Sequence, residues 1–284
     1  MSDNPAPASR SWQRRLARLA VAAALMYVGV IVVLLLLENW LVYHPSGLEN
    51  WQAPPNWQIQ DVDLAAGDGT KIHGWWLPCA DSKQALIFFH VNAGNLSWWG
   101  DALVVLREQL GVSVLSVDYP GYGKSAGKPS EAGCYAAADA GYAWLTDTQH
   151  IAGNQILIFG ESLGGGVAVD LASRRPHRAL ILDRTFTSVP DVGQTVYPWL
   201  PVHWLMRNRF DSLSKLAQCR QPIFIAHGTA DQVVPFGHGE KLFQAAHEPK
   251  HFMRIEGGDH NSPLSAAFFT ELRAFLDQVS VVAK

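Results

Sequence analysis

The segment at residues 156–166 constrains the fold of this chain more than any other. It reads Ile-Leu-Ile-Phe-Gly-Glu-Ser-Leu-Gly-Gly-Gly, an apolar run of strand length that passes without a spacer into Gly160-Glu161-Ser162-Leu163-Gly164 and then into helix-compatible sequence. Glycines two positions before and after the serine permit a turn in which larger side chains would clash. A buried strand, this turn and a following helix together predict a serine hydroxyl raised above a sheet, at the positive end of a helix dipole.

Composition fits one folded domain with an added N-terminal segment. Of the 284 residues, 48% are hydrophobic and 17% are charged, which excludes a disordered chain. A formal net charge of −3 without a basic stripe gives no reason to expect nucleic acid as a partner. Cys79, Cys134 and Cys219 lack metal-ligand spacing, so we expect no metal and no disulfide framework. We also expect no organic cofactor. The sequence leaves the oligomeric state open.

An uncharged segment near the N-terminus, Leu19–Leu37, is long enough to cross a membrane. As a helix, its residues span about 28 Å, close to the ~30 Å hydrocarbon core of a bilayer. Glu38 is the first charged residue after it. Four arginines precede it: Arg10, Arg14, Arg15 and Arg18. The positive-inside rule therefore predicts a basic cytoplasmic N-terminus at residues 1–18, a transmembrane anchor at 19–37 and a domain on the periplasmic or extracellular side.

A cleaved signal peptide is the alternative interpretation of this segment. Signal peptides have a shorter apolar region, about 7–15 residues, and a small-x-small cleavage site. Here the apolar run is longer and ends Leu-Leu-Leu-Leu-Glu-Asn-Trp. An uncleaved anchor therefore fits better.

After the anchor, residues 38–56 contain several prolines and predict a linker to a domain at 57–284. The domain begins with an antiparallel hairpin around Asp68-Gly69 and continues with short apolar strands that alternate with helical segments. The predicted strands are Ala85–Phe89, Ser113–Val117, Ile156–Phe159, Ala179–Leu182, Ile223–Ala226 and Phe252–Ile255. This alternation predicts an α/β fold with a mostly parallel central sheet flanked by helices.

The alternation is interrupted at about residues 185–216. This stretch contains three prolines together with large apolar residues. Long insertions of this kind are often lids or binding loops, so we expect a small cap over the active site. The alternative is that these side chains pack on the surface of the domain itself.

Two later loops supply the partners that a nucleophilic serine needs. A serine must be activated by a base, and the base must be oriented by an acid, in the chain order serine, acid, histidine. Asp231 follows the predicted strand Ile223–Ala226, and His260 follows Phe252–Ile255 in a glycine-rich loop. Asp183, after Ala179–Leu182, is a second possible acid, but the loop that carries Asp231 is more typical of an acid turn. We therefore predict a catalytic triad of Ser162, Asp231 and His260.

An oxyanion hole requires two backbone N–H groups directed at the developing negative charge. One is expected from Leu163, directly after the nucleophile. The other is expected from the loop after Ala85–Phe89, at Asn92, with Ala93 as the neighbouring alternative.

A series of motifs in this order carries a family resemblance. They are His90-x-Asn92-Ala93-Gly94-Asn95, Asp118-Tyr119-Pro120-Gly121-Tyr122-Gly123-Lys124-Ser125, Gly160-Glu161-Ser162-Leu163-Gly164-Gly165, Thr185-Phe186-Thr187-Ser188, Phe210-Asp211-Ser212, His227-Gly228-Thr229-x-Asp231 and Gly257-Gly258-x-His260. The chain resembles membrane-anchored serine hydrolases with an α/β-hydrolase domain, the bud-emergence-type relatives of prolyl-oligopeptidase-like and lysophospholipase-like enzymes. The resemblance covers roughly residues 40–280. It implies the same triad and, for some members, ester, thioester or lipid-ester substrates.

The chain departs from that family at position 91, where the usual glycine is replaced by valine. Glycine permits a positive φ and close backbone approach, which a β-branched residue resists. Two consequences are open: either the loop takes a different path, or the oxyanion hole is impaired.

These features predict a hydrolase of carboxylic esters, either a carboxylesterase or a lysophospholipase-like enzyme. Trp98 and Trp99 follow the oxyanion loop and are expected to bind a small-molecule or lipid ester substrate. Packing in the core is the alternative role for both tryptophans. A thioesterase or a serine peptidase of the same fold is the alternative activity, and a degenerate fold that only binds ligands is the non-enzyme alternative.

Overall fold

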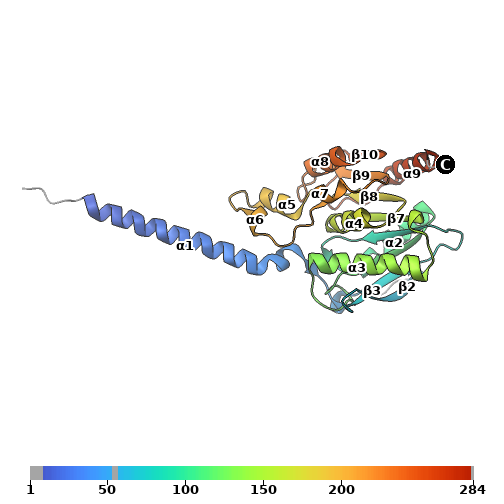
Figure 1. The fold of residues 1–284 in the computed structure, drawn as a ribbon, viewed down its shortest axis with the longest axis horizontal. Coiled ribbons are helices and arrows are strands. Elements are labelled where there is room, and N and C mark those ends of the chain that lie inside the picture. The colour runs from blue at the N-terminus through green and yellow to red at the C-terminus, as the bar shows by residue number, and fades with distance from the viewer. Residues whose placement is uncertain (1–8, 53–56, 283–284) are drawn as a thin grey trace, which may run out of the picture.

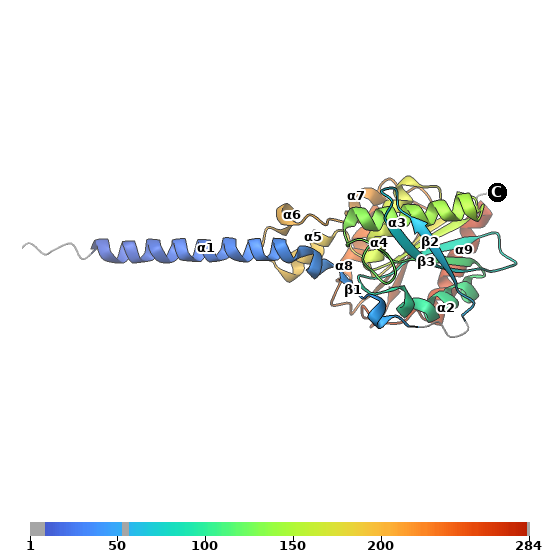
Figure 2. The ribbon, with the colours of Figure 1, turned by 90° about the horizontal axis from the view of Figure 1, so that it is seen from below.

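The structure, a computed structural model, describes residues 9–52 and 57–282. One long helix, α1 (Ser9–Val42), projects from an α/β domain, as Figures 1 and 2 show. Its segment Trp12–Val42 is long and apolar enough to cross a membrane. An N-terminal apolar helix of this kind is typical of a membrane anchor or a signal sequence.

The domain is built on an eight-stranded sheet with the order β10-β9-β8-β7-β4-β6-β3-β2. The strands are β2 (Gln60–Ala65), β3 (Lys71–Leu77), β4 (Ala85–Phe89), β6 (Ser113–Val117), β7 (Ile156–Glu161), β8 (Ala179–Asp183), β9 (Ile223–Gly228) and β10 (Lys250–Ile255). The hairpin β2–β3 joins β6 antiparallel, and all other neighbours are parallel. This confirms the predicted mostly parallel sheet, in which β7, β8 and β9 extend further at their carboxyl ends than expected and β10 begins earlier.

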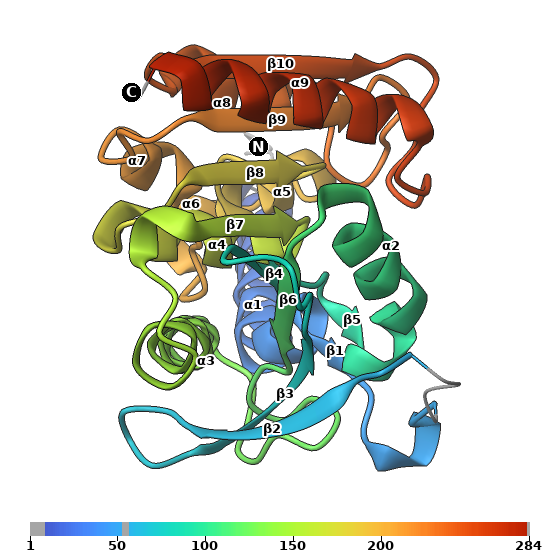
Figure 3. The ribbon, with the colours of Figure 1, turned by 90° about the vertical axis from the view of Figure 1, so that its right-hand side faces the viewer.

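Helices cover both faces of this sheet (Figure 3). They are α2 (Gly100–Leu110), α3 (Glu131–Ala143), α4 (Leu163–Arg174), α8 (Gly237–Ala245) and α9 (Ala266–Val282). Successive strand residues point to opposite faces, so Ile87 and Phe89 join one core cluster with α3, α4 and α8, while Leu86 and Phe88 join another with α2 and α9. Short helical turns complete the domain: η1 (Leu48–Asn50), η2 (Leu96–Trp99), the π-helical η3 (Trp144–Thr148) and η4 (Gly153–Gln155).

The segment around the end of α1 differs from the predicted linker at 38–56. Helix α1 continues to Val42, the Tyr43 side chain is buried, and β1 (His44–Pro45) pairs in parallel with β5 (Ala93–Gly94). Tyr43 Oη donates a hydrogen bond of 2.7 Å to Asn208 Oδ1. Residues 38–45 are therefore part of the packed structure and not a separate linker. Residues 53–56 of that prediction, like residues 1–8 of the basic N-terminus, lie outside the described residues.

The predicted insertion at 185–216 forms three short helices between β8 and β9. They are α5 (Val189–Val196), α6 (Val202–Leu205) and α7 (Ser212–Leu216). Helix α7 packs against α4 and α8 and belongs to the body of the domain. Helices α5 and α6 instead lie beside the domain end of α1 (Figures 1 and 2), and we call residues 189–206 the cap.

Candidate active site

Ser162 occupies the turn between β7 and α4 in a backbone conformation that L-residues rarely adopt. Its φ of 52° and ψ of −116° represent strain of about 1–3 kcal/mol. A Cβ at Gly160 would collide with the Gly164 carbonyl, and one at Gly164 would collide with the Phe89 carbonyl. Ser162 N–H donates to Asp183 O at 3.0 Å, which fixes the turn against β8. The two glycines are therefore required by close packing, as the sequence predicted.

The structure brings together the serine and the two residues predicted as its partners. His260 Nε2 lies 3.0 Å from Ser162 Oγ, and His260 Nδ1 lies 2.7 Å from Asp231 Oδ2. Asp231 follows β9 and His260 follows β10, so adjacent strands deliver both side chains to the carboxyl edge of the sheet. In this geometry, the imidazole can accept the serine proton at Nε2 while Nδ1–H donates to the carboxylate.

The surroundings of Asp231 keep its carboxyl ionised. Its Oδ1 accepts hydrogen bonds from the backbone N–H groups of Val233 at 2.9 Å and Val234 at 2.8 Å. Burial alone would raise the pKa of Asp231, but hydrogen bonds from His227 and His260 outweigh burial and lower this pKa below its ordinary value. A fixed anion beside His260 stabilises an imidazolium if one forms.

The second possible acid, Asp183, is engaged elsewhere. Its Oδ2 accepts hydrogen bonds from Arg184 Nε at 2.9 Å and Nη2 at 2.6 Å. Arg184 Nη2 also donates to Glu161 Oε1 at 2.9 Å, so two buried carboxyl groups share one guanidinium. Burial raises the pKa of both carboxyl groups, and that of Glu161 reaches about 7.

Arg184 is a site residue that the sequence analysis did not single out. Besides Asp183 and Glu161, its guanidinium binds the carbonyl of Ser262, two residues after His260. It therefore links the serine turn, the end of β8 and the histidine loop. Its signal in the sequence was a cation directly after a strand that ends in aspartate.

The predicted oxyanion residues lie beside Ser162 in one cavity. Leu163 is the first residue of α4, so its backbone N–H has no acceptor within the helix. Asn92 is fixed on several sides: its carbonyl accepts from His44 N–H at 2.9 Å and Tyr122 Oη at 2.7 Å, and its Nδ2 donates to Val42 O at 3.1 Å. The Asn92 side chain is thus bonded toward the end of α1, and its backbone N–H is the candidate oxyanion donor.

The loop accommodates valine at position 91 without left-handed backbone. Among the described residues, the non-glycine positions with positive φ do not include Val91, and Gly94 takes the left-handed conformation with φ of 81°. Val91 O accepts a hydrogen bond of 2.8 Å from His90 Nδ1, and burial lowers the pKa of that histidine. Of the two consequences left open for Val91, the structure has a loop path that does not require glycine there.

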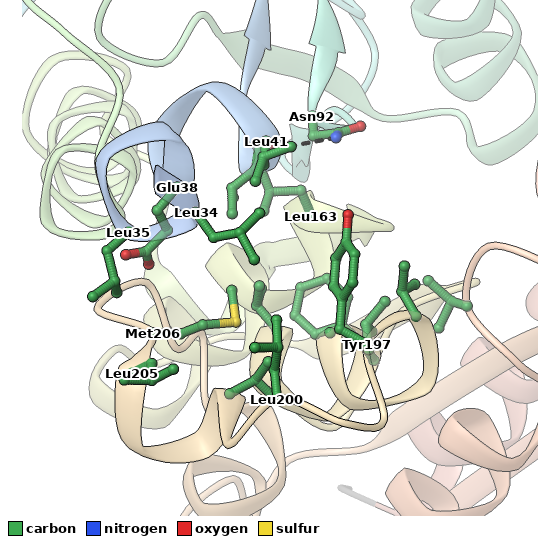
Figure 4. A pocket seen from close by; sticks show the side chains of 18 of the residues that line it. Leu34, Leu35, Glu38, Leu41, Asn92, Leu163, Tyr197, Leu200, Leu205 and Met206 are labelled. Carbon is green, nitrogen blue, oxygen red and sulfur yellow. Dashed lines mark hydrogen bonds between the residues drawn. The ribbon is translucent and has the colours of Figure 1, made fainter. Parts of the chain in front are cut away.

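A cavity of about 240 Å³ extends from Ser162 to helix α1, and Figure 4 shows most of its lining side chains. Ser162, Leu163 and Asn92 line it together with apolar residues of α1 and the cap. From α1 come Ile31, Leu34, Leu35, Glu38, Leu41 and Val42; from the cap come Val189, Val192, Gly193, Val196, Tyr197, Leu200, Val202, Leu205 and Met206; Phe186, Val233 and Val234 complete it. The lining on α1 repeats every three or four residues, which is one face of a helix.

The two predicted substrate-binding tryptophans do not line this cavity. Trp98 is half exposed, and its Nε1–H donates to Asn50 O at 3.1 Å. Trp99 packs against Phe88 and stacks on His90, in the core between the sheet and α2. Both tryptophans follow the oxyanion loop in sequence but lie outside the cavity. The cavity therefore does not support the prediction that they bind substrate.

Within residues 9–52 and 57–282, no group of three or more His, Cys, Asp and Glu side chains is placed to hold a metal ion. All three cysteines are free thiols, and burial raises the pKa of Cys134 above its ordinary value.

Comparisons with known proteins point to one fold family. A family model described as the alpha/beta hydrolase fold matches residues 84–212, which include the serine turn and end before Asp231. An uncharacterized protein of Mycobacterium tuberculosis is 35% identical over 92% of this chain and 95% of its own length. Alpha/beta hydrolase domain-containing protein 17B of Xenopus tropicalis is 32% identical over 85% of this chain and 83% of its own.

Solved structures show the same fold. The Pyrococcus furiosus esterase Pf2001 superposes with a TM-score of 0.68 at 19% identity, covering 84% of this chain and 97% of the esterase. The esterase RhEst1 from Rhodococcus superposes with a TM-score of 0.57 at 17% identity, covering 76% and 98%.

Proposed function

This chain belongs to the α/β-hydrolase family, and we propose that it is a serine hydrolase that cleaves carboxylic ester bonds through an acyl-enzyme. One observation carries the proposal: Ser162 Oγ, the His260 ring and the Asp231 carboxylate form a continuous hydrogen-bonded chain, with separations of 3.0 Å and 2.7 Å. This is the relay by which a serine alcohol becomes a nucleophile at neutral pH.

The reaction begins when Ser162 Oγ attacks the ester carbonyl carbon and its proton passes to His260 Nε2. The tetrahedral intermediate places its negative oxygen between the backbone N–H groups of Leu163 and Asn92. His260 then protonates the departing alcohol, which leaves the acyl group on Ser162. Water, deprotonated by His260, attacks the acyl-enzyme. The bond to Ser162 Oγ then breaks, His260 returns the proton to that oxygen, and the acid is released, while Asp231 orients the imidazole and stabilises its charged form.

Two further observations support an acyl substrate and, among acyl substrates, the choice of an ester for the first assay. The cavity beside Ser162 is lined almost entirely by apolar side chains, which suits an acyl chain. Structural neighbours such as Pf2001 and RhEst1 are esterases by name. A thioester requires the same machinery, so a thioesterase is the alternative activity that the assay below must separate.

The membrane position forms part of the proposal. We place α1 across the bilayer as an uncleaved anchor, with residues 1–18 in the cytoplasm and the catalytic domain on the periplasmic or extracellular side. Support for an uncleaved helix comes from its last turns: Leu34, Leu35 and Leu41 line the cavity at Ser162, so removing α1 would remove a wall of the site.

The test uses the full chain in lipid nanodiscs. A fluorophosphonate probe should label the wild type and not Ser162→Ala, and the variant should lose at least about a thousandfold in kcat on p-nitrophenyl esters. Absence of labelling in the folded wild type would favour a binding module. Faster turnover of matched acyl thioesters or peptide amides than of p-nitrophenyl esters would reassign the bond that is cleaved.

A further inference from the structure

The membrane helix forms part of the proposed acyl-binding site. Ile31, Leu34 and Leu35 line the cavity, and all three lie within the uncharged run of α1. Ile31 is seven residues before Glu38, the first charged residue after that run, which is about 10 Å along a helix. One leaflet of hydrocarbon is about 15 Å thick. If Glu38 lies at the membrane surface, the cavity reaches the depth at which lipid acyl chains lie.

The cap follows α1 further than the cavity does, over about the thickness of one leaflet. Tyr27 Oη donates a hydrogen bond of 3.0 Å to the carbonyl of Trp199, and the two rings are 6.1 Å apart. Tyr27 lies eleven residues before Glu38, which corresponds to about 16 Å of helix. Figures 1 and 2 show the cap beside α1 and on the side of the domain from which the helix projects. A domain that stood wholly above the membrane would make no contact with Tyr27.

The outer surface of the cap is apolar and aromatic. Trp204 is 91% exposed, Val196 is 59% exposed and Trp199 is 54% exposed. Residues 192–206 contain no Asp, Glu, Lys or Arg, and Arg207 follows directly. Exposed tryptophans in an uncharged segment next to arginine are typical of surfaces that enter the interface of a bilayer.

Glu38 joins α1 to the segment that directly follows the cap without placing a free charge in the cavity. Its Oε1 accepts hydrogen bonds from the backbone N–H groups of Arg207 at 2.8 Å and Asn208 at 2.7 Å, and from Asn208 Nδ2 at 2.9 Å. Its Oε2 lies 3.2 Å from Arg207 Nε. The carboxylate is therefore bonded toward the cap, and an acyl chain can pass over α1 without meeting an unpaired charge.

We propose that cap residues 192–206 insert into the same leaflet as the last turns of α1, and that the cavity takes the acyl chain of a lipid ester directly from that leaflet. The proposal rests on the serine hydrolase function above and names its substrate class. The acyl chain of the lipid would lie between α1 and the cap, with the ester carbonyl at Ser162. At about 240 Å³, the cavity is smaller than typical pockets for whole drug-sized ligands. It suits one acyl chain, with the rest of the lipid remaining in the membrane.

The first experiment measures cap insertion and does not depend on catalysis. The full chain is placed in phosphatidylcholine nanodiscs whose lipids carry bromine on the acyl chains, which quench nearby tryptophans. The loss of tryptophan fluorescence caused by the brominated lipids should be larger in the wild type than in Trp204→Phe. Trp98→Phe, which removes a half-exposed tryptophan of the domain, should lose as much fluorescence as the wild type. Equal quenching in the wild type and Trp204→Phe would overturn the insertion.

The second experiment tests lipid uptake. Trp204 does not line the cavity, so Trp204→Glu should leave hydrolysis of soluble p-nitrophenyl butyrate within about twofold of the wild type. Hydrolysis of a long-chain fluorogenic ester embedded in phosphatidylcholine vesicles should fall at least tenfold. Trp204→Leu should restore the vesicle activity, because the leaflet requires an apolar side chain and not tryptophan in particular. Val105→Glu, which places the same charge on an exposed part of α2, should change neither rate.

Three outcomes would overturn the proposal: an unchanged vesicle rate in Trp204→Glu, an equal loss on both substrates, or a loss in Trp204→Leu as large as that in Trp204→Glu. If the cap instead binds a second copy of the chain, Trp204→Glu will convert a dimer to a monomer without any difference in lipid quenching. A wild type that inserts its cap but fails to label with fluorophosphonate would refute the serine hydrolase and leave the insertion standing.

Discussion

The two halves of the site are built in opposite ways. Ser162, Asp231 and His260 are polar, come from turns and loops after parallel strands and are held by hydrogen bonds of 2.7–3.0 Å. The cavity wall facing them is made of helices from distant parts of the chain, α1 and the cap, and consists mainly of apolar contacts. In the proposed function, the first half determines which bond can be broken, and the second determines which molecule reaches it. Variants in the two halves should therefore change different measurements.

The largest expected effect is in the polar half. Asp231→Asn should lower kcat on p-nitrophenyl esters by about 10³–10⁴-fold, because a neutral amide no longer holds the imidazole in the productive tautomer. Binding of a short ester to the apolar wall should change little. Stopped assays at pH 7.5 with the full chain give the ratio; a loss of less than tenfold would mean that Asp231 is not the acid.

The same carboxyl makes a pH-dependent contribution to stability. Its pKa is lowered in the folded chain, so this contribution is fully present above the ordinary pKa of aspartate and is lost as the pH falls through the lower folded value. The difference in Tm between the wild type and Asp231→Asn should therefore shrink below about pH 4. A constant difference down to pH 3 would contradict this assignment.

The next largest effect is expected from losing the hydrogen bonds by which Glu38 joins α1 to Arg207 and Asn208, directly after the cap. Glu38→Ala leaves three buried or partly buried N–H donors without their acceptor and should cost about 3 kcal/mol of unfolding free energy, roughly 10 °C in Tm. Glu38→Gln retains an acceptor oxygen and should lose much less. Thermal unfolding in detergent measures both, and equal losses would show that the carboxylate geometry is not what holds the wall.

A smaller effect is expected from the buried carboxyl beside the nucleophile. Burial raises the pKa of Glu161 to about 7, so the stability that it contributes is present below the ordinary pKa of glutamate and is lost as the pH rises through about 7. Glu161→Gln removes this dependence. Between pH 4.5 and pH 8, the variant should gain about 2 kcal/mol relative to the wild type, measured by urea unfolding at both pH values. No relative gain would mean that Arg184 keeps Glu161 ionised throughout.

The smallest expected effect is on the preference for esters of a given acyl-chain length. Leu34→Trp should fill the cavity and shift the preference from long to short p-nitrophenyl esters by about tenfold in kcat/KM. Leu25→Trp, on an exposed part of α1 away from the cavity, is the matched control and should leave the preference unchanged. If both variants shift the preference alike, the effect comes from the membrane segment as a whole and not from the wall.

The sequence indicated which polar side chains would lie together but not which residues would form the apolar wall, for physical reasons. The serine turn, Asp231 and His260 have local signals, because each follows a short apolar strand. The glycines of the serine turn are a further signal, since the backbone approaches too closely there for a side chain. The face of α1 at Ile31, Leu34 and Leu35 has no contrast with its neighbours, because the whole segment is apolar and its helical period cannot be seen. Trp98 and Trp99 were predicted from closeness in sequence, which does not determine the direction of a side chain.

The contact between Val42 and Asn92 has a mechanical consequence. Helix α1 runs without interruption from Ser9 to Val42, and the carbonyl of its last residue accepts a hydrogen bond from Asn92 in the loop next to the nucleophile. Bilayers thicker or thinner than an apolar helix change the tilt of that helix. If α1 spans the bilayer as proposed, a change in tilt would pull on the Asn92 side chain and so shift the residue whose backbone N–H is proposed to bind the oxyanion. Turnover would then depend on membrane thickness even for a water-soluble ester.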